Sequence, residues 1–148
     1  MSPLSALPAF QPLCLFSVLL VLFMFLLGGL TANYRRLAKV VVNPEDVGVN
    51  PGSHVEVAEA PSTLRCKRAH LNAIENIPGF LALATIFTLA GGSTTAGWAY
   101  FGLYFASRVA HAICYLNELQ PFRTISFFIG QLCLIGMSVQ ILMAAFGR

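Results

Sequence analysis

The chain has 148 residues, of which 57% are hydrophobic and only 10% are charged, whereas an ordinary soluble domain carries about 25% charged residues. A soluble fold this poor in charge would expose large apolar patches to water, so the composition excludes an ordinary soluble domain and favours an integral membrane protein. The net charge of +3 comes without a basic patch with interleaved aromatic residues, and nucleic acid is therefore not an expected partner.

The first predicted membrane helix spans about residues 12–39. A bilayer-spanning helix needs about 20 mostly apolar residues, and the centre of this segment, residues 13–30, carries no charge. No basic segment precedes it, and it is longer than the apolar core of a signal peptide, so we expect a retained helix. A long polar segment, residues 40–61, follows, and the turn signals around Pro44 and Pro51 predict a loop rather than a second domain.

Three further apolar segments predict membrane helices, over about residues 62–90, 95–116 and 121–146. The chain is then a single domain, residues 1–148, of the all-α class: an integral membrane four-helix up-down bundle with both termini on one side. Lys and Arg residues gather at the other side, around loop 40–61 and turn 117–121, and only Arg148 lies at the terminal side. Positive charge marks the cytoplasmic side, so we expect this loop to face the cytoplasm, from an endoplasmic reticulum or a bacterial inner membrane.

Polar residues inside the predicted helices form one-sided stripes. Charges within a membrane are costly and usually face protein or a water-filled cavity. Spacings of three, four and seven residues place side chains on one helix face. Such spacings relate Arg68, Asn72 and Glu75 in the second helix, Arg108, His111 and Tyr115 in the third, and Arg123, Phe127 and Gln131 in the fourth. Thr124 lies beside Arg123, and Arg35 adds a cation at the end of the first helix.

The charges of these stripes do not balance. A single acid, Glu75, stands against four cations, which are Arg35, Arg68, Arg108 and Arg123. The group is therefore expected to bind an anion. A ligand with two carboxylates and one ammonium group fits this pattern, and glutathione is such a molecule. Arginine guanidinium groups bind carboxylates through paired hydrogen bonds, which suits this task.

Structural explanations compete for several of these residues. Arg35 is also explained as a cation that marks the cytoplasmic end of a span, and Arg65 as an interface residue whose charged end reaches the polar boundary. His70 is explained as an interfacial or structural histidine; no second pair of metal-binding residues accompanies it, so no metal site is expected. For Glu75 and Arg108 the main alternative is a structural ion pair within the bundle.

The run RCKRAHLNAIENIP, from Arg65 to Pro78, is specific. It resembles the second-helix signature of the family of membrane-associated proteins in eicosanoid and glutathione metabolism (MAPEG). Three other segments resemble the same family: Asn43-Pro44-Glu45-Asp46, Arg108-Val109-Ala110-His111 with Tyr115, and Pro121-Phe122-Arg123 with Ser126-Phe127-Phe128. The resemblance covers nearly the whole chain.

This resemblance implies a homotrimer of four-helix subunits, with glutathione bound between neighbouring subunits near the cytoplasmic face. It implies that Arg123 stabilises the glutathione thiolate and that Glu75 engages the ammonium group. Thr124 or Tyr115 is predicted to donate a hydrogen bond to the thiolate, which makes Arg123, Thr124 and Tyr115 the predicted catalytic residues. The predicted glutathione-binding residues are Arg35, Arg68, His70, Asn72, Glu75, Arg108, His111, Tyr115, Arg123 and Gln131.

The expected function is a membrane-bound glutathione transferase that conjugates the thiolate to lipophilic electrophiles dissolved in membrane lipid, with peroxidase activity on lipid hydroperoxides. Leu71 and Phe127 resemble the transferase members of the family, whereas Gln131 and the segment Arg108 to His111 resemble the members that isomerise an endoperoxide. The alternatives are therefore a glutathione-dependent isomerase of the prostaglandin E synthase kind and a non-catalytic membrane scaffold.

Overall fold

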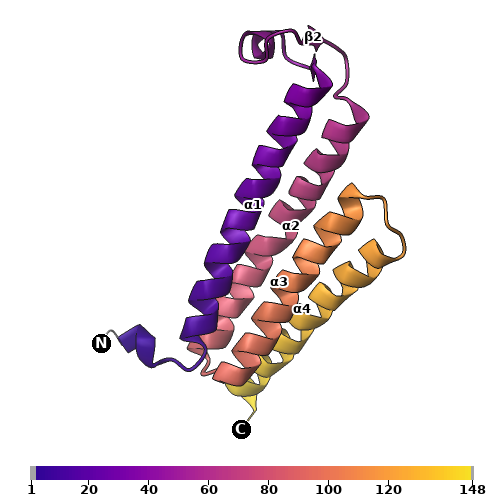
Figure 1. Ribbon diagram of the computed structural model, residues 1–148. Helices are drawn as coiled ribbons and strands as arrows, with labels where there is room; N and C mark the ends of the chain where they lie inside the picture. The colour runs from indigo at the N-terminus through magenta and orange to yellow at the C-terminus, as the bar shows by residue number, and fades with distance from the viewer. Residues whose placement is uncertain (1–2, 148) are drawn as a thin grey trace.

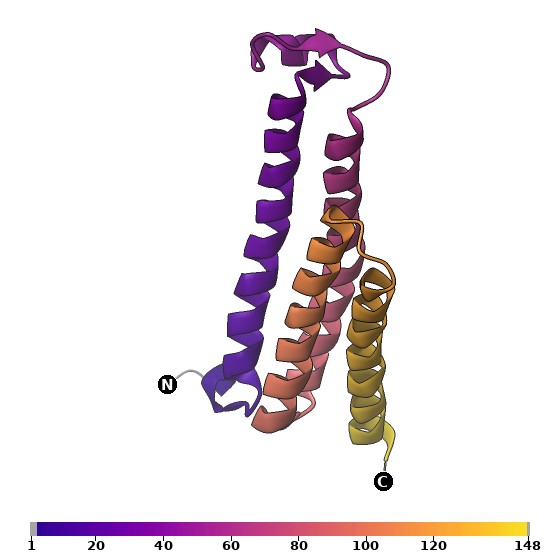
Figure 2. The same cartoon turned by 45° about the vertical axis from the view of Figure 1, so that its right-hand side comes forward.

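The computed structural model describes residues 3–147, and its four long helices pack side by side (Figures 1 and 2). They are α1 (Phe10–Ala38), α2 (Pro61–Leu89), α3 (Thr94–Leu116) and α4 (Phe122–Phe146), and a 3-10 helix, η1 (Pro3–Ala6), precedes them. The all-α four-helix prediction is confirmed, and each helix begins and ends within about two residues of its predicted position. Arg148, which the charge argument used, lies outside the described residues.

Successive helices run in opposite directions, so both ends of the chain lie at the same end of the bundle (Figure 1). α1 and α2 each have 29 residues and α3 has 23. At 1.5 Å per residue these lengths are about 44 Å and about 35 Å. The longer pair projects beyond α3 and α4 at the end opposite the termini (Figure 2), which we call the loop end.

The connection between α1 and α2 covers the loop end with a small ordered structure. β1 (Val40–Val41) and β2 (His54–Val55) pair in parallel, with Val40 opposite His54, and the 3-10 helix η2 (Pro44–Gly48) lies between them in the chain. Lys39 adopts the left-handed conformation that ends α1, and its Nζ donates to the Pro51 carbonyl at 2.9 Å. The predicted loop therefore contains a short two-stranded sheet.

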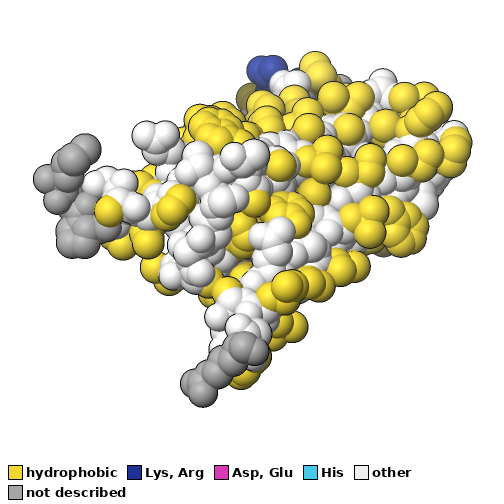
Figure 3. Space-filling model, turned by 90° about the horizontal axis from the view of Figure 1, so that it is seen from below, with side chains coloured by type: hydrophobic (Ala, Val, Ile, Leu, Met, Phe, Trp, Pro, Cys, Tyr) yellow, Lys and Arg dark blue, Asp and Glu magenta, His cyan; other side chains and the backbone are white. Residues whose placement is uncertain are grey.

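The outer surface of the bundle is apolar. Large hydrophobic side chains such as Phe25, Leu132 and Met143 are exposed, which suits a surface that faces lipid. Three helices, α1, α2 and α4, are long and apolar enough to cross a membrane. α3, which carries Arg108 and His111 in its second half, is not among these three, so the prediction of a fourth membrane-spanning segment is not supported by length and composition. The end that carries both termini shows hydrophobic or uncharged side chains over most of its described surface, with basic atoms only at one edge (Figure 3).

The hydrophobic core packs the middle parts of the four helices against one another. The Phe80 ring of α2 stacks on the Tyr104 ring of α3 with centroids 4.0 Å apart, and Phe101 packs edge-on against Phe80 at 5.7 Å. Leu20 of α1 and Met137 of α4 are fully buried in the same cluster. This packing fixes how the polar ends of α2, α3 and α4 meet near the loop end.

Candidate functional site

Three helices meet in a pocket of about 200 Å³ near the loop end. Its lining residues are Pro61, Leu64, Arg65 and Arg68 from α2, Tyr115 from α3 and Arg123 from α4. The sequence predicted Arg68, Tyr115 and Arg123 for one site, and the fold brings these three together. Arg65, which has an interfacial explanation, lines the same pocket.

Arg123 is held in place from two sides. Its guanidinium carbon lies 4.7 Å from the centre of the Tyr115 ring, which is a cation–π contact. The Gln120 amide lies on the other side. In the orientation that satisfies both neighbours, its oxygen accepts from Arg123 Nη2 at 2.6 Å and Nε at 3.1 Å, and its nitrogen donates to Thr124 Oγ1 at 3.1 Å. Neither contact neutralises the arginine.

The backbone of Arg123 is anchored as well. His111 Nδ1 donates to the Arg123 carbonyl at 2.9 Å, and Ser126 Oγ donates to the same oxygen at 2.9 Å. The His111 and Tyr115 rings are 6.0 Å apart. His111 is buried, and its Nε2 has no hydrogen-bond partner within residues 3–147. The predicted stripe on α3 therefore fixes the first turn of α4, where Arg123 lies.

Arg68 is a basic residue of the pocket that forms no polar contact with another described residue. It is exposed and makes no hydrogen bond or ion pair with another described residue. Arg65, one helical turn earlier, pairs with Glu118 at 2.8 Å. No acid of the described part of the chain lines the pocket, so Arg68 and Arg123 present guanidinium groups without a carboxylate partner there. Such groups bind carboxylates, phosphates and thiolates through charge-assisted contacts.

Residues Arg68, Asn72 and Glu75 lie along the outward side of α2, as their spacing predicted. Arg68 and Glu75 are exposed, and Asn72 is half-buried. The Glu75 carboxylate pairs with no described residue, Arg108 included, so the alternative of a Glu75–Arg108 ion pair is wrong within the chain. A bare carboxylate facing lipid costs about 3 kcal/mol, and this face is therefore expected to be covered by protein, water or ligand.

The sequence of the chain matches a known protein family. Residues 13–143 match the MAPEG family. The chain belongs to this family. It is therefore a multi-pass integral membrane protein, and the expectation drawn from the Arg65 to Pro78 run is confirmed.

Two kinds of enzyme are similar to this MAPEG chain. It is 36% identical to prostaglandin E synthase of Homo sapiens over 141 residues, 95% of this chain and 90% of the relative. It is 32% identical to microsomal glutathione S-transferase 1 of Homo sapiens over 139 residues, 90% of this chain and 88% of the relative. For microsomal glutathione S-transferase 1 of Bos taurus the identity is 36% over 116 residues. The identities do not separate the two activities.

Arg108 of this MAPEG chain lies outside the pocket, between α3 and α4. Only 2% of it is exposed. Its Nη2 donates to the Phe127 carbonyl at 3.1 Å and to the Ser126 carbonyl at 3.4 Å, and its guanidinium lies over the Tyr104 and Phe127 rings at 5.4 and 5.2 Å. Nε and Nη1 have no partner among the described residues. Arg108 therefore attaches α4 to α3 behind the candidate site.

His70 and Gln131 were predicted to bind glutathione, and both lie away from the pocket in one chain. The His70 ring packs against α1 where Gly28 leaves room, because a Cβ at Gly28 would lie 3.2 Å from His70 Cε1. Gln131 Nε2 donates to Asn76 Oδ1 at 3.1 Å, and Asn76 Nδ2 donates to the Asn72 carbonyl at 2.8 Å. The His70 contact joins α2 to α1 and the Gln131 contact joins α4 to α2, and a ligand role for either residue stays a prediction.

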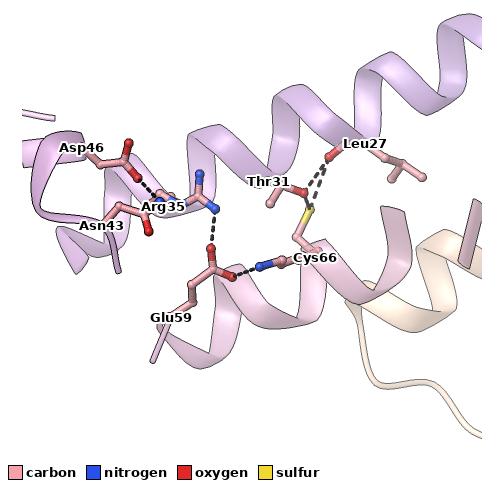
Figure 4. A network of polar contacts seen from close by, with 8 residues as sticks. Leu27, Thr31, Arg35, Asn43, Asp46, Glu59 and Cys66 are labelled. Carbon is pink, nitrogen blue, oxygen red and sulfur yellow. Dashed lines mark hydrogen bonds and ion pairs between the residues drawn. The ribbon is translucent and has the colours of Figure 1, made fainter. Parts of the chain in front are cut away.

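Arg35 forms an ion pair with an acidic residue that was not included when the charges of the helical stripes were compared. Glu59, at the end of the loop, forms an ion pair with Arg35, and its second oxygen lies 3.3 Å from Lys67 Nζ (Figure 4). Only 7% of the Glu59 side chain is exposed. Burial raises the pKa of Glu59, but the hydrogen bonds and positive charges of Arg35 and Lys67 outweigh burial and bring this pKa below its ordinary value of 4.5. Arg35 therefore clamps the loop to α1 and does not line the pocket.

The same view shows how α1 and α2 approach each other below this clamp (Figure 4). Thr31 Oγ1 donates to the Leu27 carbonyl at 2.9 Å and lies 3.5 Å from Cys66 Sγ. The Cys66 thiol is fully buried, which suits a packing role. The Arg65 to Pro78 run thus presents a buried side to α1 and a polar side outward.

Sequence reasoning missed Gln120 and Glu59. Gln120 lies three residues before Arg123 in a short turn, where helical periodicity carries no information. Glu59 belongs to the loop, and its partners come from two different helices. The sequence contained one indication of the Glu59 contact. Glu59 is the last acidic residue before α2, and it lies beside the basic residues that α1 and α2 carry at the loop end.

Proposed function

We propose that the pocket binds glutathione at the boundary between neighbouring copies of the chain and ionises its thiol for conjugation to lipophilic electrophiles. The observation that carries this proposal is the position of Arg123, which Tyr115 and Gln120 hold in a pocket without an acid. A guanidinium group fixed in this way stabilises an anion without being neutralised first. Membership of the MAPEG family supports glutathione as the ligand.

The charges of the outward α2 face fit glutathione. Arg68 and Glu75 are seven residues apart, which is about 10 Å along a helix, and Asn72 lies between them. Arg68 would hold a carboxylate, Glu75 the ammonium group and Asn72 a peptide group, so the ends of an extended peptide would meet charges of opposite sign. Within residues 3–147, neither Arg68 nor Glu75 has an ion-pair partner that ligand binding would displace.

Oligomerisation follows from the same face. A lone chain would present Glu75 and Arg68 to lipid, at a cost for each charge. A second copy packed along α2 would cover them and enclose the ligand. In line with the family resemblance, we propose a homotrimer. The mass of the detergent-solubilised protein, measured by analytical ultracentrifugation, tests this assembly.

The chemical task of the pocket is to lower the pKa of a thiol. A free thiol has a pKa of about 8.5, so only a few per cent is ionised at pH 7. A guanidinium group in a partly dehydrated site lowers such a pKa by one to three units, and each unit corresponds to about 1.4 kcal/mol of thiolate stabilisation. Arg123 would supply this charge, and the Tyr115 or Thr124 hydroxyl would donate a hydrogen bond to the sulfur.

When bound, glutathione supplies a thiolate that attacks an electrophilic carbon or the oxygen of a hydroperoxide. The residues of the chain hold its charges, keep its sulfur beside Arg123 and limit water around it. The apolar outer surface of the bundle borders the lipid in which apolar electrophiles concentrate. Transferase activity on such electrophiles, with peroxidase activity on lipid hydroperoxides, is therefore the proposed function.

A glutathione-dependent isomerase of the prostaglandin E synthase kind is the second candidate. The 36% identity to the human prostaglandin E synthase over 95% of this chain favours it. Turnover of a general aryl halide would support the transferase. Isomerisation of an endoperoxide without aryl halide turnover would support the isomerase instead. A non-catalytic scaffold would bind glutathione and form no thiolate at neutral pH.

The test is a pH titration of thiolate absorbance in the ultraviolet, with purified protein and added glutathione. The proposal predicts a thiolate band at pH 7 that Arg123→Ala loses. Arg36→Ala is the matched control, because Arg36 is exposed and, among the described residues, hydrogen-bonds only Asn33 on its own helix. A band that persists in Arg123→Ala would refute the role of Arg123, and no band in any variant would favour the scaffold.

A further inference from the structure

A long apolar groove runs between α1 and α3. Its volume is about 580 Å³, and every residue that lines it is apolar. On α1 the lining extends from Leu19 to Leu30, and on α3 from Phe105 to Leu116. It shares no residue with the candidate pocket. The proposed function gives this groove no role.

The length of the groove matches one leaflet of a bilayer. Leu19 and Leu30 are eleven residues apart, as are Phe105 and Leu116, so both walls are about 16 Å long. The hydrocarbon core of a bilayer is about 30 Å thick, and half of it is about 15 Å. The groove ends at Leu116, the last residue of α3, and it therefore spans the leaflet on the loop side.

A polar pocket begins where the groove ends. This second pocket, of about 240 Å³, shares Leu116 with the groove and is lined further by Tyr34, Ser62, Arg65 and Glu118. The hydroxyl groups of Tyr34 and Ser62 make no hydrogen bond to another described residue. Two hydroxyl donors, a guanidinium group and the Glu118 carboxylate thus surround one space at the polar end of the apolar groove.

The charge of this space favours an anion. Arg65 pairs with Glu118 at 2.8 Å, but 68% of the Glu118 side chain is exposed, and exposed ion pairs contribute little. Arg68 and Arg123 line the neighbouring pocket, which also includes Arg65, so the local potential is positive. A phosphate group can therefore displace Glu118 as the partner of Arg65.

We propose that the groove and the polar pocket together bind one anionic phospholipid of the loop-side leaflet. One acyl chain lies between α1 and α3, and the phosphate group lies against Arg65, Tyr34 and Ser62. Since Arg65 borders both this site and the candidate active site, the bound lipid fixes a residue at the boundary of the two. The proposal concerns lipid binding alone and stands whether or not the chain is a transferase.

The experiment is native mass spectrometry of the delipidated full chain with phosphatidylglycerol and phosphatidylcholine of identical acyl chains. The wild type should retain one phosphatidylglycerol per chain in preference to phosphatidylcholine. Arg65→Gln should weaken that binding about fivefold, because one basic residue near a membrane surface contributes about 1 kcal/mol. Arg36→Gln, at the same end but outside both pockets, should leave the preference unchanged.

A second pair of variants tests the groove. Ile113 is 53% exposed at its rim, so Ile113→Trp fills the groove without disturbing the core and should abolish lipid retention. Ile135→Trp is the matched control, because Ile135 is 58% exposed on α4 and lines no part of the groove. Circular dichroism of each variant confirms that the bundle still folds.

Two outcomes would overturn the proposal. Equal retention of both lipids, unaffected by Arg65→Gln and Ile113→Trp, would show that the retained lipid covers the surface of the bundle without a specific site. A change of oligomeric mass in Ile113→Trp, with lipid retention intact, would show that another copy of the chain covers the groove.

Discussion

His111 Nδ1 of α3 donates to the backbone carbonyl of Arg123 at 2.9 Å. This bond ties the first turn of α4 to α3 beside the candidate pocket, and the Arg123 guanidinium then lies on the Tyr115 ring. The histidine touches the backbone of the arginine and not its charge, so its effect on thiolate chemistry would be indirect.

Loss of this bond is expected to misplace Arg123. His111→Leu should lower the free energy of unfolding by about 1 kcal/mol and raise the pKa of bound glutathione. His111→Asn, whose amide nitrogen can occupy the Nδ1 position, should retain most of both. Thermal unfolding and thiolate titration of the two variants measure these effects. Equal thiolate pKa values in His111→Leu and the wild type would contradict the positioning role.

The charged face of α2 is expected to serve the ligand rather than the fold. Arg68→Gln should raise the KM for glutathione about tenfold, since a hydrogen bond to a charged group contributes about 1.5–3 kcal/mol. Its melting temperature without ligand should equal that of the wild type, because Arg68 has no described partner. Arg36→Gln should change neither quantity. A lower melting temperature with an unchanged KM would assign Arg68 to the fold.

Gly130 is expected to tolerate no side chain, because Arg108 occupies the space above it. A Cβ at Gly130 would lie 2.7 Å from Arg108 Nη2 and 2.9 Å from Ser107 Oγ. Gly130→Ala should therefore destabilise the protein by about 1–3 kcal/mol. Gly29→Ala is the matched control, since a Cβ there meets no atom within 4 Å, and it should be neutral or stabilising. Chemical unfolding in detergent compares them, and equal stabilities would show that Arg108 is mobile.

The Glu59 clamp should make stability depend on pH in the acid range. Because the pKa of Glu59 is lowered in the folded state, its contribution is present above about pH 4.5 and is lost as the pH falls through the folded-state value. Glu59→Gln should remove about 1 kcal/mol at neutral pH and flatten the acid dependence.

Unfolding measured between pH 3 and pH 6 checks this dependence. The control is Glu56→Gln, because Glu56 is exposed and its Oε1 lies 3.4 Å from Nε2 of His54, which is exposed as well. An acid dependence that survives in Glu59→Gln would mean that another carboxylate titrates.

The helices and the meeting of Arg68, Tyr115 and Arg123 could be predicted from the sequence. Apolar runs between polar turns fix where a membrane helix begins and ends, and helical spacing tells which residues share a face. Polar faces avoid lipid, so stripes on three adjacent helices are expected to point toward one another near the same end.

The partners of individual residues could not be predicted. Helical periodicity predicts the helix face on which Arg108 lies. Its hydrogen-bond acceptors, however, are the backbone carbonyls of Ser126 and Phe127, and every residue type has such a carbonyl. Arg35 was counted as a free cation because Glu59, its partner, reaches it from a loop. Gln131 finds Asn76 on a helix far away in sequence. In each case the contact depends on the depth and rotation of packed helices, which a residue pattern does not encode.

The unequal lengths of the helices give the proposed site two approaches. α1 and α2 rise past α3 and α4 at the loop end (Figures 1 and 2), and the candidate pocket lies where the shorter helices stop. A water-soluble peptide can reach this position from the aqueous side, and an apolar reactant can reach it laterally from the bilayer. Under the proposed function, the two reactants would then meet at Arg123 without either having to dissolve in the phase of the other.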